Sequence, residues 1–262
     1  AAFADQSFLP EESQLVAVNS INWARIMMQI VYYFSAALKV GAPEQAVSFS
    51  VPTGNFGDIY AGFLAKRIGL PIKQLVVATN SNDILHRFIN GNEYSTTDLS
   101  HTLSPSMDIL VSSNFERYLF HLFDKDAEML RTFMSKLGQE SQQVSDEKWQ
   151  QMRECFSSAR VDDALTCETI AKVFSDTGKL VDPHTAVGIR AARECNTDPS
   201  TPMITLSTAH PAKFSDAINE AGLKTPELPA HLTGLFEKEE HYSVVANDLA
   251  AVTEFVTKHS HS

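Results

Sequence analysis

The sequence has few cysteines, no block of basic residues and no long apolar run. Its three cysteines form no CxxC pair, which argues against a disulfide scaffold or a zinc ribbon and fits a reducing cytoplasm. The 32 acidic residues outnumber the 21 basic ones, so the net charge of −11 argues against nucleic acid or an anionic membrane as a partner. The longest apolar stretch, residues 26–40, is broken by polar side chains and is too short to cross a membrane.

The remaining composition is that of a globular protein. Of the 262 residues, 44% are apolar and 20% are charged, which excludes wholesale disorder and a collagen-like fibre. The length suits one large α/β domain or two modest ones. The sequence starts at Ala1 and shows no secretory signal, so we expect either a processed chain or the later part of a longer polypeptide. The histidines lack metal-ligand spacing, and we predict no metal site.

Short apolar runs alternate with segments of helical periodicity. Glycine and proline mark the ends of these segments, as at Gly41, Pro43 and Gly69. Continuous apolar strands that alternate with helices predict a parallel sheet with helices on both faces. Residues 15–18 form a short β-rich run. The expected strands are 46–51, 74–78 and 202–207, and the expected helices are 22–38, 59–68, 182–193 and 215–221.

The middle of the chain has a different character. Residues 114–174 are charged, with few β-branched runs, and we predict a helical insertion there. Residues 1–113 and 175–224 then form the α/β domain, and residues 225–262 form a C-terminal helix and tail. No internal repeat or low-complexity tract is present.

The most informative local pattern is the turn after the expected strand 46–51. Gly54 and Gly57 lie between this strand and the start of a helix. Glycines let backbone N–H groups converge, and the helix N-terminus adds partial positive charge, so the pattern is typical of a phosphate site. It matches neither a Walker A loop nor GxGxxG. Spacing alone leaves a plain tight turn equally open.

The same turn carries a resemblance to a known family. VPTGNFGDIYAGFLAKRIGLP resembles the cofactor-phosphate loop of threonine synthases, in the branch found in fungi and many bacteria. VNSINWARI, ATNSNDILHRF, SPSMDILVSSNFER, DPHTAVG and STAHPAKF resemble the same family in the same order, over residues 16–222. The resemblance implies a pyridoxal-phosphate enzyme of the tryptophan-synthase-β fold. It implies a lyase of threonine biosynthesis that converts O-phospho-L-homoserine and water to L-threonine and phosphate.

The resemblance also implies which residues bind the cofactor. Thr208, at the end of the last expected strand, matches the residue that hydrogen-bonds the pyridine nitrogen; the alternative is a threonine that caps the strand. Asp58 is unsuited to direct contact with a dianion, so we expect it to cap the helix or to turn its side chain away. The residues that match the cofactor-phosphate loop are Gly54, Asn55, Phe56, Gly57 and Asp58.

A second set of residues is implied for the phosphate of the substrate. Asn19, Ser20 and Arg25 match the family's asparagine, serine and arginine at that site. Arginine suits bidentate phosphate contacts, and the other two add neutral donors. Without the resemblance, residues 19–25 would predict only a helix cap followed by a surface arginine.

The family's Schiff-base lysine is expected elsewhere. It lies in a Ser-Phe-Lys-Asp-like segment of a preceding region, and no such segment occurs here. We therefore assign no catalytic residue, expect this chain to be inactive alone, and expect its partner to be the missing N-terminal region of the same protein. Lys213 fits a surface position better than the Schiff-base role. His184 begins a helix near the site, and its role is left open.

Two other functions remain as alternatives. One is a related pyridoxal-phosphate dehydratase acting on serine or threonine. Its substrates carry no phosphate, which would leave Asn19, Ser20 and Arg25 without a purpose. The other is a non-catalytic phosphate-binding fragment or paralogue, which the missing lysine favours for this chain as given. The sequence does not predict the oligomeric state.

Overall fold

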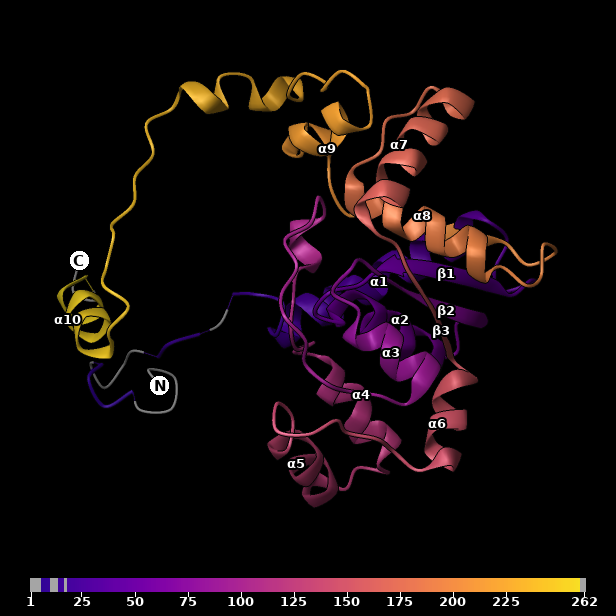
Figure 1. Cartoon of the computed structure of the whole chain (residues 1–262), viewed down its shortest axis with the longest axis horizontal. Helices are drawn as coiled ribbons and strands as arrows, with labels where there is room; N and C mark the ends of the chain where they lie inside the picture. The colour runs from indigo at the N-terminus through magenta and orange to yellow at the C-terminus, as the bar shows by residue number, and fades with distance from the viewer. Residues whose placement is uncertain (1–5, 10–13, 17, 260–262) are drawn as a thin grey trace. The chain divides into compact units, whose positions relative to one another are not determined.

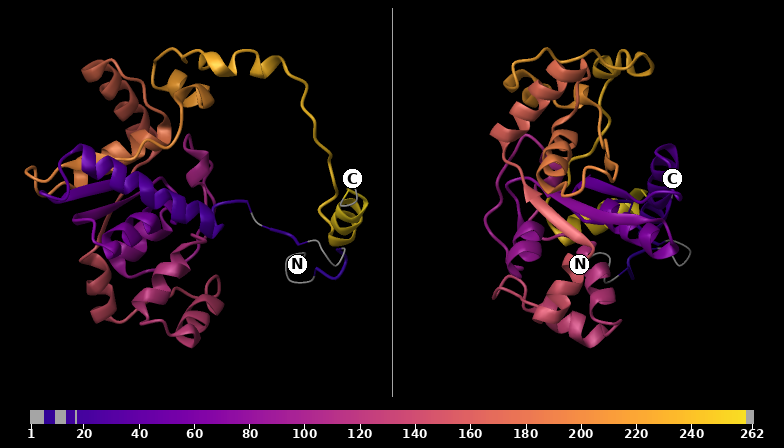
Figure 2. Two further views of the ribbon diagram at one scale, coloured as in Figure 1. Left: turned by 180° about the vertical axis from the view of Figure 1, so that it is seen from behind. Right: turned by 90° about the vertical axis from the view of Figure 1, so that its right-hand side faces the viewer.

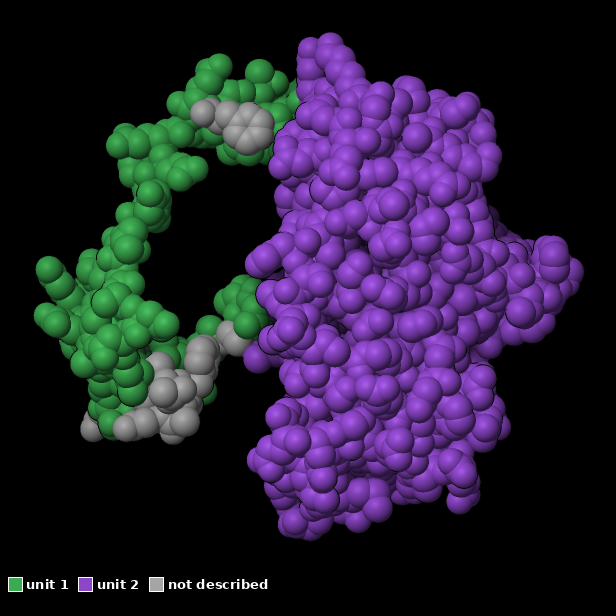
Figure 3. Space-filling view, viewed as in Figure 1, with its two compact units in different colours: residues 1–19, 228–262 green, residues 20–227 purple. Residues whose placement is uncertain are grey.

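The computed structural model describes residues 6–9, 14–16 and 18–259. Its contacts divide the chain into two units, coloured separately in Figure 3. One unit comprises residues 1–19 and 228–262, and the other comprises residues 20–227. The second unit contains the sheet and every element that forms the site described below. The predicted tail boundary at residue 225 lies close to the division at residue 228.

The larger unit is built on a four-stranded parallel sheet (Figure 1). The strands lie in the order β3-β2-β1-β4, with Phe49 of β1 opposite Leu75 of β2 and Ile204 of β4. All of β1 is buried, as expected for a strand with neighbours on both sides and helices on both faces. The strands are β1 (Val47–Pro52), β2 (Ile72–Thr79), β3 (Phe156–Arg160) and β4 (Met203–Thr205).

Helices cover both faces of this sheet (Figure 2). Helices α2 (Gly57–Ile68) and α3 (Ile84–Gly91) pack against one face, and α1 (Trp23–Lys39) packs on α2. Helix α8 (Pro183–Cys195) packs against the other face, with α7 (Asp163–Thr177) beside it.

Helix α8 approaches the sheet very closely. A Cβ at Gly188 would lie 2.9 Å from Thr205 Cγ2 and 3.1 Å from Pro52 Cγ. The hydroxyl of Ser50 donates to the Gly188 carbonyl at 2.7 Å. This contact fixes the start of α8 near the carboxyl ends of β1 and β4.

The segment 114–174 differs from the prediction of a helical insertion. Helices α4 (Phe115–Leu122), α5 (Ala127–Ser135) and α6 (Asp146–Arg153) are followed by β3, which pairs with β2 and forms one edge of the sheet. The strand has the sequence FSSAR and is only partly buried. Its weak apolar pattern explains why the sequence does not reveal it, and the α/β fold therefore resumes at residue 156.

The strand order places a topological switch point between β1 and β4. The chain runs outward from β1 through β2 to β3, and then crosses the opposite face by α7 and α8 to reach β4 on the other side of β1. Ligands of open α/β sheets bind outside the carboxyl ends of the strands at such a point.

The remaining elements are short. No helix in the described ranges is both long enough and apolar enough to span a membrane. The 3-10 helices are η1 (Pro105–Met107), η2 (Pro211–Lys213), η3 (Ala230–Leu232) and η4 (Leu235–Glu237), and the last two α-helices are α9 (Ser215–Glu220) and α10 (Leu249–His259).

Candidate functional site

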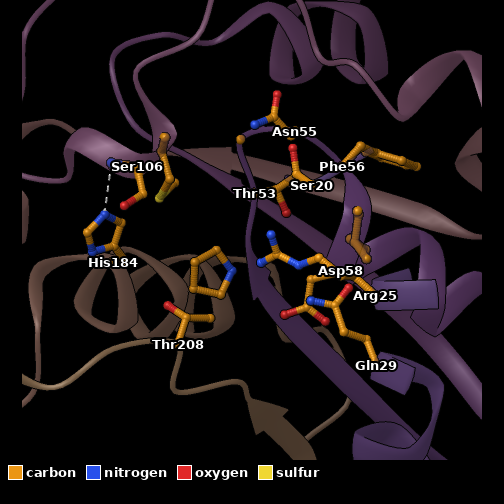
Figure 4. A pocket seen from close by; sticks show the side chains of 15 residues that line it. Ser20, Arg25, Gln29, Thr53, Asn55, Phe56, Asp58, Ser106, His184 and Thr208 are labelled. Atoms are coloured by element: carbon orange, nitrogen blue, oxygen red, sulfur yellow. Dashed lines mark hydrogen bonds between the residues drawn. The ribbon is translucent and has the colours of Figure 1, made fainter. Parts of the chain in front are cut away.

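A pocket of ≈ 240 Å³ opens at the switch point between β1 and β4 (Figure 4). It brings together every predicted site residue except Asn19, which belongs to the other unit. The predicted residues that line it are Ser20, Arg25, Gly54, Asn55, Phe56, Gly57, Asp58 and Thr208. Their binding roles remain predictions.

The turn after β1 presents a row of unused backbone donors to this pocket. Phe56 adopts a left-handed conformation, φ 60° and ψ 4°, and Gly57 begins α2 directly after it. Such a left-right pair of residues makes a concave array of N–H groups that suits an anion. Among the described residues, no acceptor is found for the backbone N–H groups of Gly54, Asn55, Phe56, Gly57, Asp58 and Ile59.

The left-handed conformation of Phe56 is unusual for a bulky residue and needs support. Its ring is buried and lies 5.0 Å from Phe115 and 5.6 Å from Phe156, measured between ring centroids. Aromatic pairs of this kind contribute about 0.5–1.5 kcal/mol each, which is comparable with a backbone strain of roughly 1–3 kcal/mol. The aromatic core therefore helps to hold the turn in this conformation.

Two carbonyl groups of the turn accept hydrogen bonds from residues that do not line the pocket. The hydroxyl of Ser112 donates to the Gly54 carbonyl at 2.8 Å. The backbone N–H and the side-chain amide of Asn114 both donate to the Asn55 carbonyl at 3.0 Å. The sequence does not single out Ser112 or Asn114, although both lie in the string SPSMDILVSSNFER.

The two glycines of the turn lie in close contact with neighbouring segments. A Cβ at Gly54 would lie 3.1 Å from the Ser106 carbonyl oxygen and 3.1 Å from Met107 Cα. A Cβ at Gly57 would lie 3.3 Å from the amide nitrogen of Asn114. Each glycine therefore lets a neighbouring segment approach the turn from behind or from the side.

Helix α1 supplies polar side chains to the same pocket. Arg25 and Gln29 lie one turn apart on its surface, and Figure 4 shows both side chains directed into the pocket. Asn22 caps the helix by accepting the Ala24 N–H at 2.9 Å. The sequence does not indicate Gln29; its spacing of four residues from Arg25 is the signal that could have found it.

Asp58 differs from one of the two expectations for it, that its side chain caps the helix. It does not cap α2, because Phe56 is the cap residue and no side chain caps the helix. Instead the Tyr33 hydroxyl donates to the Asp58 carbonyl at 2.8 Å and to its Oδ1 at 3.1 Å. Burial raises the pKa of this carboxyl to about 6, although the Tyr33 hydrogen bond acts in the opposite direction.

The opposite wall of the pocket is formed by Thr208 and His184. Thr208 follows β4, and His184 lies in the first turn of α8, buried against the Phe214 ring at 4.7 Å. Among the described residues that line the pocket there is no lysine. Lys213 is exposed in η2, with its ammonium group 5.7 Å from the centre of the Phe214 ring.

Comparisons with known proteins show which proteins this chain is similar to. A family model described as "Threonine synthase, C-terminal" matches residues 185–256. Over 264 aligned residues the chain is 58% identical to the threonine synthase of Pseudomonas aeruginosa, covering 99% of this chain and 55% of that protein. The chain is thus similar to a threonine synthase over nearly its whole length. It spans just over half the length of this relative.

Two solved structures of the threonine synthase family are similar along the whole chain. The pyridoxal-phosphate-bound threonine synthase of Brucella melitensis is 48% identical with a TM-score of 0.92, and the yeast threonine synthase is 37% identical with a TM-score of 0.87. Each comparison covers 100% of this chain and 56% of the other. These structures confirm the predicted fold and the family resemblance.

Proposed function

We propose that this chain is the C-terminal portion of a threonine synthase. In the complete enzyme it acts in the conversion of O-phospho-L-homoserine and water to L-threonine and phosphate. The observation that carries the proposal is that two elements suited to phosphate, the Gly54–Asp58 turn and the Ser20–Arg25 segment, face one pocket. The reaction needs both, because the cofactor and the substrate each bring a phosphate group.

The proposed cofactor is pyridoxal 5′-phosphate, and the residues of the pocket fit it. The unused N–H groups of the turn suit its phosphate, and the Thr208 hydroxyl across the pocket suits its ring nitrogen. When bound, pyridoxal phosphate supplies an electron sink that stabilises negative charge on a substrate carbon. The neutral Thr208 hydroxyl would leave the ring nitrogen unprotonated more readily than an aspartate would.

The proposed role of the chain's own residues is to bind and orient. Backbone N–H groups from Asn55 to Asp58 hold one phosphate without a fixed positive charge. Ser20 and Arg25, with Asn19 as the third predicted contact, bind the phosphate of the substrate. The Arg25 guanidinium stabilises the charge that grows on this phosphate as it leaves.

The competing functions make different demands on the pocket. A serine or threonine dehydratase acts on substrates without phosphate and has no need of Arg25 beside Ser20. A non-catalytic phosphate-binding role for the isolated chain is favoured by one observation, the absence of lysine among the described residues that line the pocket. We also propose a cytoplasmic location, from the sparse, unpaired cysteines.

The test is Arg25→Ala in the full-length protein, with Arg131→Ala, at an exposed arginine of α5, as the control. Loss of a charge-assisted contact of roughly 1.5–3 kcal/mol should lower kcat/KM for O-phospho-L-homoserine by about one to two orders of magnitude. Uptake of pyridoxal phosphate, followed by absorbance, should stay near the wild-type level. An equal loss of cofactor uptake would contradict the assignment of Arg25 to the substrate.

A further inference from the structure

Asp182 is a buried carboxylate that accepts more hydrogen bonds than a helix cap needs. It precedes α8 and accepts the backbone N–H groups of His184 at 2.9 Å and Thr185 at 3.3 Å, which is the ordinary work of an N-cap. Its Oδ1 also accepts from His184 Nδ1 at 3.0 Å, and its Oδ2 accepts the Thr185 hydroxyl. Two side chains on the first turn of α8 are therefore oriented by one carboxylate, which is 0% exposed.

The first of these side chains reaches one wall of the pocket. His184 Nε2 lies 3.2 Å from the backbone N–H of Ser106, in the segment that packs against Gly54. A backbone N–H can only donate, so Nε2 must carry a lone pair and Nδ1 must carry the proton that Asp182 accepts. His184 is thus a neutral imidazole with both nitrogens engaged. This arrangement answers the question left open by the sequence: His184 connects Asp182 to η1 and is not a free base.

The second side chain reaches the main chain of Thr208, which lies in the same wall of the pocket as His184. The Thr185 hydroxyl gives its proton to Asp182, and its oxygen accepts the backbone N–H of Thr208 at 3.3 Å. Because the bond is made to the Thr208 main chain, it leaves the Thr208 hydroxyl available to the pocket. Figure 4 shows Ser106, His184 and Thr208 around the same side of the pocket.

We propose that Asp182 is a positioning residue that fixes two points on this side of the pocket, Ser106 through His184 and Thr208 through Thr185. The proposal rests on the proposed function only in that Thr208 meets the ring of the cofactor. Burial alone would raise the pKa of Asp182, but the hydrogen bonds from His184 and Thr185 outweigh it and lower the pKa. The carboxylate therefore stays ionised at neutral pH, as an acceptor of four donors must.

The first test uses the unmodified full-length protein and does not depend on any enzymatic activity. At pH 7, ¹⁵N spectra of the imidazoles should show His184 as a neutral ring protonated at Nδ1. A ring protonated at Nε2, or a doubly protonated ring, would overturn the proposal. This measurement needs no variant, so it remains decisive even if a substitution in the network prevents folding.

The second test removes one of the two hydrogen-bonded connections, the one from Asp182 through Thr185 to Thr208, in the full-length protein. Thr185→Val keeps the shape of the side chain and removes the bond to Thr208, whereas Thr185→Ser keeps the hydroxyl. We expect Thr185→Val to shift the absorbance maximum of bound pyridoxal phosphate and to raise its dissociation constant about tenfold. In Thr185→Ser, the absorbance maximum and the dissociation constant of pyridoxal phosphate should both stay near the wild-type values.

The matched control is Thr169→Val. Thr169 is also buried, and its hydroxyl donates to the Leu165 carbonyl within α7. Its loss should change stability without changing the cofactor spectrum. A wild-type spectrum and affinity in Thr185→Val would overturn the proposal. A protein that binds the cofactor as expected but does not turn over O-phospho-L-homoserine would instead refute the proposed function and leave the positioning role standing.

Discussion

The Asp58→Asn substitution should make the free energy of unfolding depend less on pH, because it removes one ionisable side chain. The pKa of Asp58 rises from 3.8 to about 6 in the folded protein. The folded state therefore holds this proton more tightly than the unfolded chain does, and its stability falls as the pH rises from about 4 to 6. Asparagine has the same shape and can still accept the Tyr33 hydroxyl, but it does not ionise.

The size of the effect follows from the shift. Roughly two pKa units correspond to about 3 kcal/mol in the free energy of unfolding, and because the carboxyl opens onto the pocket we take this as the upper bound. About half of this change in the free energy of unfolding occurs between pH 5 and pH 7. The variant should therefore gain about 1–1.5 kcal/mol over the wild type between these two pH values.

The assay is urea unfolding of the 262-residue chain at pH 5, 6, 7 and 8, which gives the difference between variant and wild type at each pH. Asp98→Asn, at an exposed aspartate, is the control and should show no such trend. A difference that is constant from pH 5 to pH 8 would show that Asp58 ionises as in the unfolded chain. The reasoning from burial would then be wrong.

The other predictions concern the turn, the packing below it and the isolated chain. A crystal structure with sulfate or pyridoxal phosphate should place the anion within hydrogen-bond distance of the N–H groups from Asn55 to Asp58, and an occupied cofactor site elsewhere would refute this assignment. Gly62→Ala should lower the free energy of unfolding by about 1–3 kcal/mol, because its Cβ would lie 2.5 Å from Tyr33 Cε1. Gly91→Ala, which meets no atom within 4 Å, should be nearly neutral in the same urea titration. The isolated chain should release no phosphate from O-phospho-L-homoserine, since the resemblance puts the required lysine in a segment this sequence lacks; turnover with a borohydride-trapped adduct on Lys213 would overturn this.

The sequence predicts the order of strand, glycine turn and helix well because the signals for it are local. Two glycines between an apolar strand and a helix start restrict the backbone, and the structure has β1, the turn and α2 in that order. The pairing of this turn with Arg25 and Thr208 comes from the family resemblance, since no local pattern connects segments so far apart. The structure adds that all three line one pocket.

The parts that the sequence misses depend on distant partners. β3 is a five-residue edge strand with two serines, so it has little apolar signal of its own. Asp182 and Pro183 predict a helix start, but nothing in DPHTA indicates that His184 bonds to Ser106, 78 positions earlier. Ser112 and Asn114 resemble an ordinary polar stretch before a helix until the fold brings them behind the turn.

The bonds behind the turn also bear on how tightly a ligand can bind. Ser112 and Asn114 reach back 58 and 59 positions to the Gly54 and Asn55 carbonyls, so the donor array takes shape only when these distant segments have folded together. The loss of chain entropy needed to align the donors is then incurred during folding and not at the moment of binding. A preorganised array can hold an anion with neutral groups alone, because little of the binding energy is spent on ordering the loop.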